Sequence, residues 1–315
     1  MSRSGCRQQG VALITALLVV ALAVVAATAM ATRLQVDVRR TANLLHGEQA
    51  YAYATAAESW AQVILRKDAS DTKIDALDED WATALPPIAV EGGVVIGRIT
   101  DLQGRFNLNS LLAKTGAPNQ VNIDYFRRLL EVLELDPDLA AALQDWIDAD
   151  VNAIFPGGAE DDAYLLKDPP YRAANRRMSD VSELRLVQGF TDEVVVALLP
   201  HVSALPDDTV INVNTATPQV LQALHANLSA DSVQQLLDAR EQTPFADSAA
   251  FLAKDALAGL GIDVPVGVSS DWFGVDIEVR VGSGRARIRS LLQRADQQLR
   301  VQSRTRLTDH LLPAG

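Results

Sequence analysis

A dense group of carboxylates lies in the middle of the chain, on either side of a Pro-Gly-Gly turn. Its six members are Asp145, Asp148, Asp150, Glu160, Asp161 and Asp162. A helix that ends near Ile147 would bring Asp148 and Asp150 to the mouth of a loop, and the turn would fold the later three back toward them. Oxygen ligands without His or Cys nearby suit Ca²⁺, which binds about six to eight oxygens. The segment therefore predicts either a calcium site or a solvated acidic loop.

The pattern matches no standard calcium-binding or catalytic motif. The run Asp148-x-Asp150-x-Asn152 lacks the glycine of an EF-hand, and Ala159 stands where the twelfth-position glutamate would be. A glycosidase-like acid–base pair has no further support, because aromatic residues that could stack on a sugar make up only 5% of the chain. The sequence also has no nucleophile elbow, phosphate-binding loop, zinc-protease motif or dinucleotide fingerprint. We expect a protein that is not an enzyme.

The composition disfavours nucleic acid as a partner. The 315 residues carry a formal net charge of −12, so the bulk of the protein repels phosphate backbones. Cys6 is the single cysteine and the four histidines are scattered, so neither an internal disulfide nor a structural zinc site is expected.

An uncharged apolar run covers residues 11–32 and ends at Arg33. At about 1.5 Å per residue, such a helix is long enough to cross the roughly 30 Å hydrocarbon core of a membrane. Three interpretations are open: a secretory signal cleaved after Ala31, a plain signal anchor, and a pilin-like leader cut between Gly10 and Val11. The junction of a short polar head ending in Gly10 with an unbroken apolar helix favours the pilin-like leader.

Thr15 is the fifth residue when the count starts at Val11. Most pilin-like helices have glutamate there, and a carboxylate in an apolar layer is costly unless it is paired. In a helical fibre it can pair with the terminal amine of the subunit above. A neutral residue suits a subunit with nothing above it, so Thr15 predicts a position at the tip. Ordinary divergence is the alternative explanation.

The remaining pattern indicates an α+β body with a helical domain inserted into it. The apolar helix continues at helical spacing to about Lys67. Strand patterns occur at residues 94–102, 272–281, 285–292 and 299–307. We therefore predict a body made of residues 33–104 and 271–315, with residues 105–270 forming an inserted helical domain.

A loose repeat marks this insertion. Phe106-Asn107-Leu108-Asn109 precedes one helical stretch, and Ile211-Asn212-Val213-Asn214-Thr215-Ala216 precedes another, in which we expect a capping side chain before a helix at 218–224. The second stretch is similar to a helix–hairpin–helix unit of DNA-uptake proteins. Its hairpin at 224–228 nevertheless lacks the Gly-x-Gly turn and the basic residues that hold a phosphate. We expect no nucleic-acid binding.

Taken together, these motifs resemble the K-type minor pseudopilin of bacterial type II secretion systems. The resemblance rests on the Gly10–Val11 junction with Thr15 and on four segments. They are GRFNLNSL at 104–111, DWIDAD at 145–150, PGGAEDDAY…DPPYRAANRRMSDVSELRLVQGF at 156–190 and VINVNTATPQVLQAL at 210–224. The likeness spans nearly the whole chain, and its middle block is highly specific.

The resemblance implies a pilin-like fold, with a long N-terminal helix, a small antiparallel sheet and a large inserted all-α domain with helix–hairpin–helix-like units. It implies that residues 1–10 are a leader, that a prepilin peptidase cuts after Gly10 and methylates Val11, and that residues 11–32 span the inner membrane. The body would stand in the periplasm. There it would cap the pseudopilus with the I-type and J-type minor pseudopilins, start its assembly and support export of folded proteins.

The resemblance also implies structural calcium in the insertion. The ligand candidates that it carries over are Asp148, Asp150, Glu160, Asp161 and Asp162. It leaves open whether the major pseudopilin and secreted substrates are further partners. The alternatives are a minor pilin of another type IV pilus-like machine, for DNA uptake or adhesion, and a secreted helical module freed by cleavage after Ala31.

Overall fold

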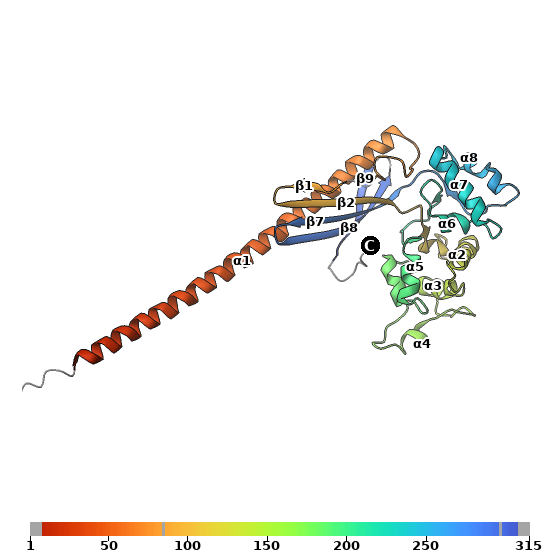
Figure 1. The fold of residues 1–315 in the computed structure, drawn as a ribbon. Coiled ribbons are helices and arrows are strands. Elements are labelled where there is room, and N and C mark those ends of the chain that lie inside the picture. Colours follow the sequence, from red (N-terminus) through yellow and green to blue (C-terminus); the bar gives the residue numbers. More distant parts are fainter. Residues whose placement is uncertain (1–7, 84–85, 296–297, 308–315) are drawn as a thin grey trace, which may run out of the picture.

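The computed structural model describes residues 8–83, 86–295 and 298–307, with side chains from residue 11 onward. One helix, α1 (Gln8–Asp71), runs without interruption for 64 residues (Figure 1). It has no proline, which would break the ladder of backbone hydrogen bonds. The predicted long helix is therefore confirmed. Residues 1–7 of the predicted leader lie outside the described residues, whereas Gly10 and Val11 lie within α1.

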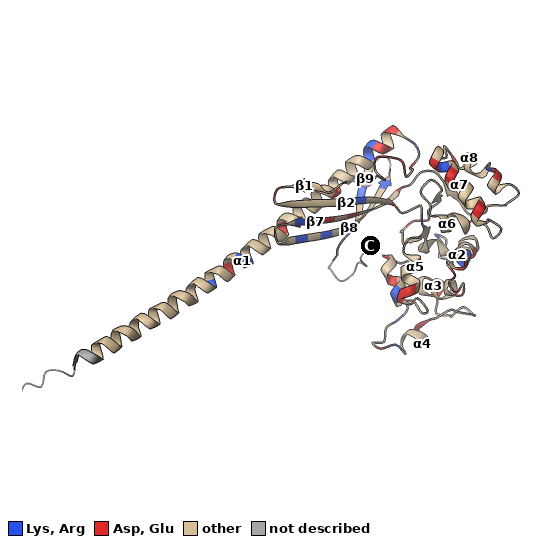
Figure 2. Ribbon diagram, viewed as in Figure 1, with Lys and Arg blue, Asp and Glu red and all other residues tan. Residues whose placement is uncertain are grey.

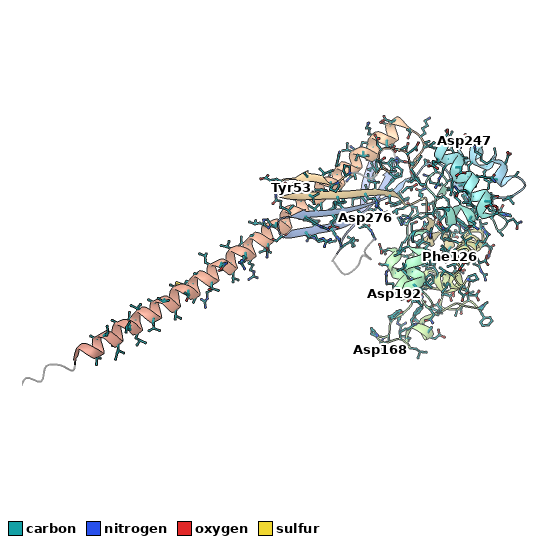
Figure 3. All side chains as sticks on the ribbon, viewed as in Figure 1. Tyr53, Phe126, Asp168, Asp192, Asp247 and Asp276 are labelled. Carbon is teal, nitrogen blue, oxygen red and sulfur yellow. The ribbon has the colours of Figure 1, made fainter. Side chains whose placement is uncertain are left out.

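No other described residue covers the N-terminal half of α1. Every residue from 11 to 40 is exposed, including the whole apolar run. Figure 2 shows no charged residue along the apolar run itself, and Figure 3 shows the side chains of this half of the helix pointing into open space. In the described part of the chain, α1 is the one helix long and apolar enough to cross a membrane. A single membrane anchor accounts for this uncovered apolar surface.

A five-stranded antiparallel sheet packs against the other half of α1. Its strands, in spatial order, are β1 (Ile88–Val90), β2 (Gly93–Asp101), β7 (Trp272–Val281), β8 (Gly284–Ala295) and β9 (Gln298–Arg306). The four predicted strands are confirmed, including the pairing of the first with a strand far along the chain. That pairing runs from Gly93 opposite Val281 to Asp101 opposite Phe273. β1 was not predicted, because three residues are too few to show an alternating pattern.

Small residues let the helix approach the sheet closely. Ala50, Ala54 and Ala61 of α1 are buried in a core with the inward-facing residues of β7 and β8. The β7–β8 turn comes even nearer: a Cβ on Gly284 would lie 2.3 Å from the carbonyl carbon of His46. Glycine is therefore required where the hairpin crosses the helix backbone.

One buried carboxylate links α1 to the far edge of the sheet. Glu58 is 2% exposed and accepts hydrogen bonds from Ser290 on β8 and from Arg304 on β9. The Arg304 contact is bidentate, with nitrogen–oxygen distances of 2.8 and 2.5 Å. Burial alone would raise the pKa of Glu58, but the hydrogen bonds from Arg304 and Ser290 outweigh it and lower the pKa.

The chain between β2 and β7 forms a separate, mainly helical region with its own core (Figure 1). Phe126, fully buried, lies in this core (Figure 3). The first half of the region contains β3 (Phe106–Asn107), η1 (Leu108–Leu111), α2 (Gln120–Val132), α3 (Leu139–Ile147), α4 (Asp161–Tyr164), η2 (Val181–Leu186), α5 (Asp192–Leu198) and β4 (Val202–Ser203). The second half contains β5 (Ile211–Asn212), α6 (Pro218–Gln222), α7 (Ala230–Gln242), α8 (Ser248–Leu252), η3 (Asp255–Leu257) and β6 (Val266–Gly267).

The sequence repeat corresponds to a structural repeat. β3 pairs in parallel with β4, and β5 pairs in parallel with β6, so each half returns to its own first strand. The amide of Asn109 bonds both backbone polar groups of Met178, and the amide of Asn214 does the same for Phe245. The asparagines thus clamp distant segments, while Thr217 is the residue that caps α6.

The Glu58–Arg304 contact yields a stability prediction. Arg304→Met would leave a buried carboxylate with Ser290 alone, so the free energy of unfolding should fall by about 3 kcal/mol at neutral pH. Because folding lowers the pKa of Glu58, its ionised carboxylate stabilises the fold at pH values above the unfolded pKa of 4.5. That stabilisation is lost as the pH falls through the folded pKa. The variant should therefore lose less folding stability than wild type when the pH is lowered.

Urea unfolding of the chain in detergent micelles, followed by tryptophan fluorescence between pH 3 and 8, would measure both effects. Arg300→Met on the same strand is the matched control, because that side chain is exposed. Equal losses in the two variants would contradict the assigned role of the buried contact.

Candidate metal centre

The end of α3 positions the first two carboxylates of the acidic segment. Leu143, Trp146 and Ile147 face the core of the insertion and orient the helix. Asp145 is fully buried in its last turn, and Asp148 is the residue at which the helix ends, with its N–H bonded to the carbonyl of Gln144 at 2.9 Å. Both carboxylates therefore lie at the start of the loop.

Two glycines turn the loop back toward α3. Gly157 has a φ of +91°, a backbone conformation that L side chains rarely adopt. A Cβ on Gly158 would lie 2.2 Å from Oδ2 of Asp145 and 2.4 Å from the carbonyl oxygen of Ile154. The chain can pass this close to the carboxylate because Gly158 has no side chain. Glu160 follows two residues later and is thereby returned to the end of α3.

Asp148, Asp150 and Glu160 converge in this loop. One carboxylate oxygen from each lies within 4.8 Å of the others. Asp145 lies beside them, and its Oδ2 accepts a 3.0 Å hydrogen bond from the N–H of Ile154. Several buried oxygens still have no hydrogen-bond partner in the described part of the chain: Oδ1 of Asp145, Oδ1 of Asp148 and both oxygens of Glu160. Unpartnered buried carboxylate oxygens are costly, so the group is suited to receive a cation.

The electrostatics of the loop indicate the same need for positive charge. Burial, reinforced by the charges of Asp150 and Asp145, raises the pKa of Asp148 to about 6. Burial, with the charges of Asp145, Asp148 and Asp150, raises the pKa of Glu160 to about 7. Burial also raises the pKa of Asp145. Each negative charge in the loop opposes ionisation of the next.

The other two sequence candidates lie outside this group. Asp161 accepts a 2.8 Å hydrogen bond from Arg172 and a 3.0 Å bond from the N–H of Ala173. Asp162 is exposed, and its Oδ1 lies 2.9 Å from the N–H of Ala163. The structure thus brings three of the five candidates together, and whether any of the five binds an ion stays a prediction.

Sequence reasoning left Asp145 out of the ligand set. Its spacing of three residues from Asp148 is the signal that could have found it, because residues three apart share one face of a helix. Later residues close the site from the other side. The N–H of Asn175 bonds the carbonyl of Trp146 at 3.0 Å, and its side chain lies 3.3 Å from the carbonyl of Asp150. The rings of Tyr164 and Tyr171 pack on Trp146.

The donor set fits calcium. It consists of carboxylate oxygens, with no His or Cys in the group. The residues that could hold the ion are Asp148, Asp150 and Glu160, with Asp145 adjacent. Such a site would neutralise a crowded acidic loop and hold it closed, which is a structural role and not a catalytic one.

Comparisons with known proteins identify the family. Two family models, each described as "Type II secretion system (T2SS), protein K", match residues 104–207 and 211–276. These two spans correspond to the two halves of the insertion, and the second extends into β7.

Curated relatives match over almost their whole length. The type II secretion system protein K of Pseudomonas aeruginosa is 40% identical over 312 residues, covering 94% of this chain and 92% of the relative. The protein of that name from Klebsiella pneumoniae is 38% identical, covering 91% of this chain and 93% of the relative.

A solved structure agrees in fold. A chain of the GspK-GspI-GspJ complex of the type 2 secretion system of enterotoxigenic Escherichia coli superposes with a TM-score of 0.77. It is 27% identical, and the match covers 86% of this chain and all of that one. The pilin-like fold with an inserted domain is thereby confirmed, and the chain belongs to the protein K family of the type II secretion system.

Proposed function

We propose that this minor pseudopilin caps the tip of a type II secretion pseudopilus, where it starts assembly and supports export of folded proteins. The observation that carries the proposal is Thr15. Its hydroxyl donates to the carbonyls of Val11 and Ala12, at 3.1 and 3.0 Å, within its own helix. A side chain satisfied in this way needs no terminal amine from a subunit above it.

The placement of the insertion supports the same position. It lies at the end of the sheet far from the N-terminus of α1 (Figure 1). We propose that residues 105–270 form a domain that ends the fibre, and that residues 33–104 with 271–315 form the pilin-like body. The relatives belong to type II secretion, which favours this assignment over a minor pilin for DNA uptake or adhesion.

The apolar half of α1 gives the proposed location and partners. Residues 11–32 would lie in the inner membrane, with the body in the periplasm. The solved relative was crystallised with I-type and J-type subunits, and we propose the same partners here. Ala12, Ala16, Ala23 and Ala27 are exposed small residues that would let neighbouring helices approach closely.

Processing of the N-terminus is the first test of this proposal. We expect a prepilin peptidase to cut after Gly10 and methylate the new N-terminal Val11. Mass spectrometry of the protein from cells with and without the peptidase should find N-methylated Val11 only in the former. A mature chain that begins at Thr32 would rule out the fibre position, because the anchor would be gone.

Position at the tip has its own test. Thr15→Glu would place a carboxylate in the apolar layer with no subunit above to pair it, so we expect fewer pseudopili and reduced secretion. Thr15→Val, which has nearly the same shape and no charge, is the matched control and should retain function. Full secretion by the glutamate variant would show that another subunit stacks above this one.

We further propose that the loop at 148–160 holds calcium that is structural. A ligand present at about 100 times its Kd stabilises the folded state by about 2.7 kcal/mol, so chelator should lower the melting temperature. Glu160→Gln should remove the part of this calcium dependence that the loop contributes, because both of its buried oxygens lack partners among the described residues.

Calorimetry with and without chelator, in wild type and variants, measures the effect. Asp162→Asn is the matched control: it removes one charge from the same segment at an exposed site outside the converging group. A melting temperature that chelator leaves unchanged would refute the structural role, and an equal loss in Asp162→Asn would refute the assigned ligand set.

A further inference from the structure

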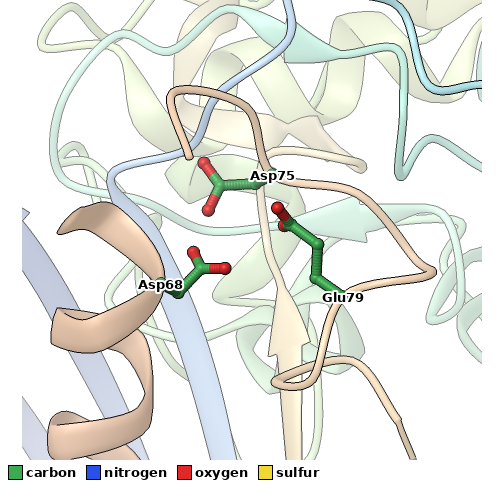
Figure 4. A group of neighbouring side chains, drawn as sticks. All are labelled: Asp68, Asp75 and Glu79. Atoms are coloured by element: carbon green, nitrogen blue, oxygen red, sulfur yellow. The ribbon is translucent and has the colours of Figure 1, made fainter. Parts of the chain in front are cut away.

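A second group of carboxylates lies where α1 meets the insertion. Asp68 is in the last turn of α1, and Asp75 and Glu79 are in the loop that follows. One oxygen from each lies within 4.8 Å of the others, and the three carboxylates point toward one another (Figure 4). No residue of the acidic loop at 148–160 takes part.

Asp75 has a buried oxygen with no partner. The residue is 1% exposed. Its Oδ2 accepts hydrogen bonds from the N–H of Ser270, at 2.7 Å, and from Arg294. Its Oδ1 lies away from water and has no hydrogen-bond partner among the residues that the structure describes. A carboxylate oxygen buried in this way requires a proton or a cation.

The charge of the group is only partly balanced. Arg294 contacts Asp75 and, at 3.4 Å, Asp68, and it also stacks on the ring of Phe273. Among the described residues, one guanidinium therefore contacts this group of three carboxylates, which leaves two negative charges that no described cation contacts. A single divalent cation has the charge that would balance them.

The geometry also suits a calcium ion. Two oxygens bound to one Ca²⁺ at about 2.3–2.6 Å lie at most about 5 Å apart, and the three carboxylates meet this limit. Asp68 and Glu79 are partly exposed, so an ion could enter and water could complete its shell. Glu79 is held in place by Thr72, whose hydroxyl donates at 2.8 Å, and by the indole N–H of Trp81, at 2.9 Å.

We propose that Asp68, Asp75 and Glu79 form a second calcium site, separate from the one in the acidic loop. The backbone of Asp75 bonds the carbonyl of Val268 at 2.8 Å and the side-chain amide of Asn212 at 2.9 Å, both in the insertion. The ion thus joins the end of the long helix to the inserted region and fixes the orientation of one on the other.

Counting bound ions tests the proposal. Native mass spectrometry of the full chain in detergent, with Ca²⁺ as the only divalent cation, should find one ion fewer in Glu79→Gln and in Asp68→Asn than in wild type. Asp78→Asn is the matched control, because it removes a neighbouring exposed charge outside the group, and should bind as many ions as wild type. Glu160→Gln reports on the acidic loop, so failure of either site can be recognised separately.

Trp81 supplies a second, site-specific measurement. Terbium emits when a nearby excited tryptophan transfers energy to it, and Trp81 contacts Glu79 directly. In the Glu160→Gln background, Tb³⁺ should give tryptophan-sensitised emission that Ca²⁺ displaces. Trp81→Phe and Glu79→Gln should lose that emission. Wild-type ion counts in both Glu79→Gln and Asp68→Asn would overturn the proposal and indicate that the carboxylates share a proton.

Discussion

The antiparallel pairing of β2 with β7 is the contact on which the architecture depends. It joins residues 93–101 to residues 273–281, so everything between them must leave the sheet and return to adjacent strands. Closing a flexible loop of that length costs about 4–5 kcal/mol of chain entropy. The cost falls if the insertion folds by itself, because its ends are then already close. The separate core of the insertion and its two internal parallel pairings favour such independent folding.

A buried polar network strengthens the same junction. Asp101, at the end of β2, accepts hydrogen bonds from Ser270, Asn212 and Thr215. Burial raises the pKa of Asp101, and the hydrogen bonds from Thr215 and Ser270 act against that rise. The network uses residues from the entry of the insertion, its centre and its exit. It therefore specifies how the insertion meets the sheet, which an apolar contact would do less strictly.

The sequence predicts elements whose pattern is long and periodic. Several alternating or helically spaced residues support each of these elements. They are the helix to about Lys67, the strands at 272–281 and 285–292, and the return to the strand at 94–102. The sequence does not predict β1 or the short parallel pairs such as Phe106 with Val202, because two or three residues are too few to show a periodic pattern.

Side-chain roles that depend on distant partners were also hidden. The sequence suggested a capping element around Asn212 and Asn214, but their partners lie at Ser270 and Phe245. At the metal centre, the acidic composition located the loop. Which carboxylates meet is decided by the chain reversal at Gly158. That reversal depends on a close approach of the backbone to Asp145, which residue spacing does not predict.

The continuity of α1 has a mechanical consequence. Its 64 residues make a rod about 96 Å long, at about 1.5 Å per residue, with no proline hinge along it. Force applied to the lipid-embedded end travels along one backbone to the sheet and the insertion, with little lost to bending. A displacement of the anchor would therefore be transmitted along one uninterrupted helix to the sheet and the insertion.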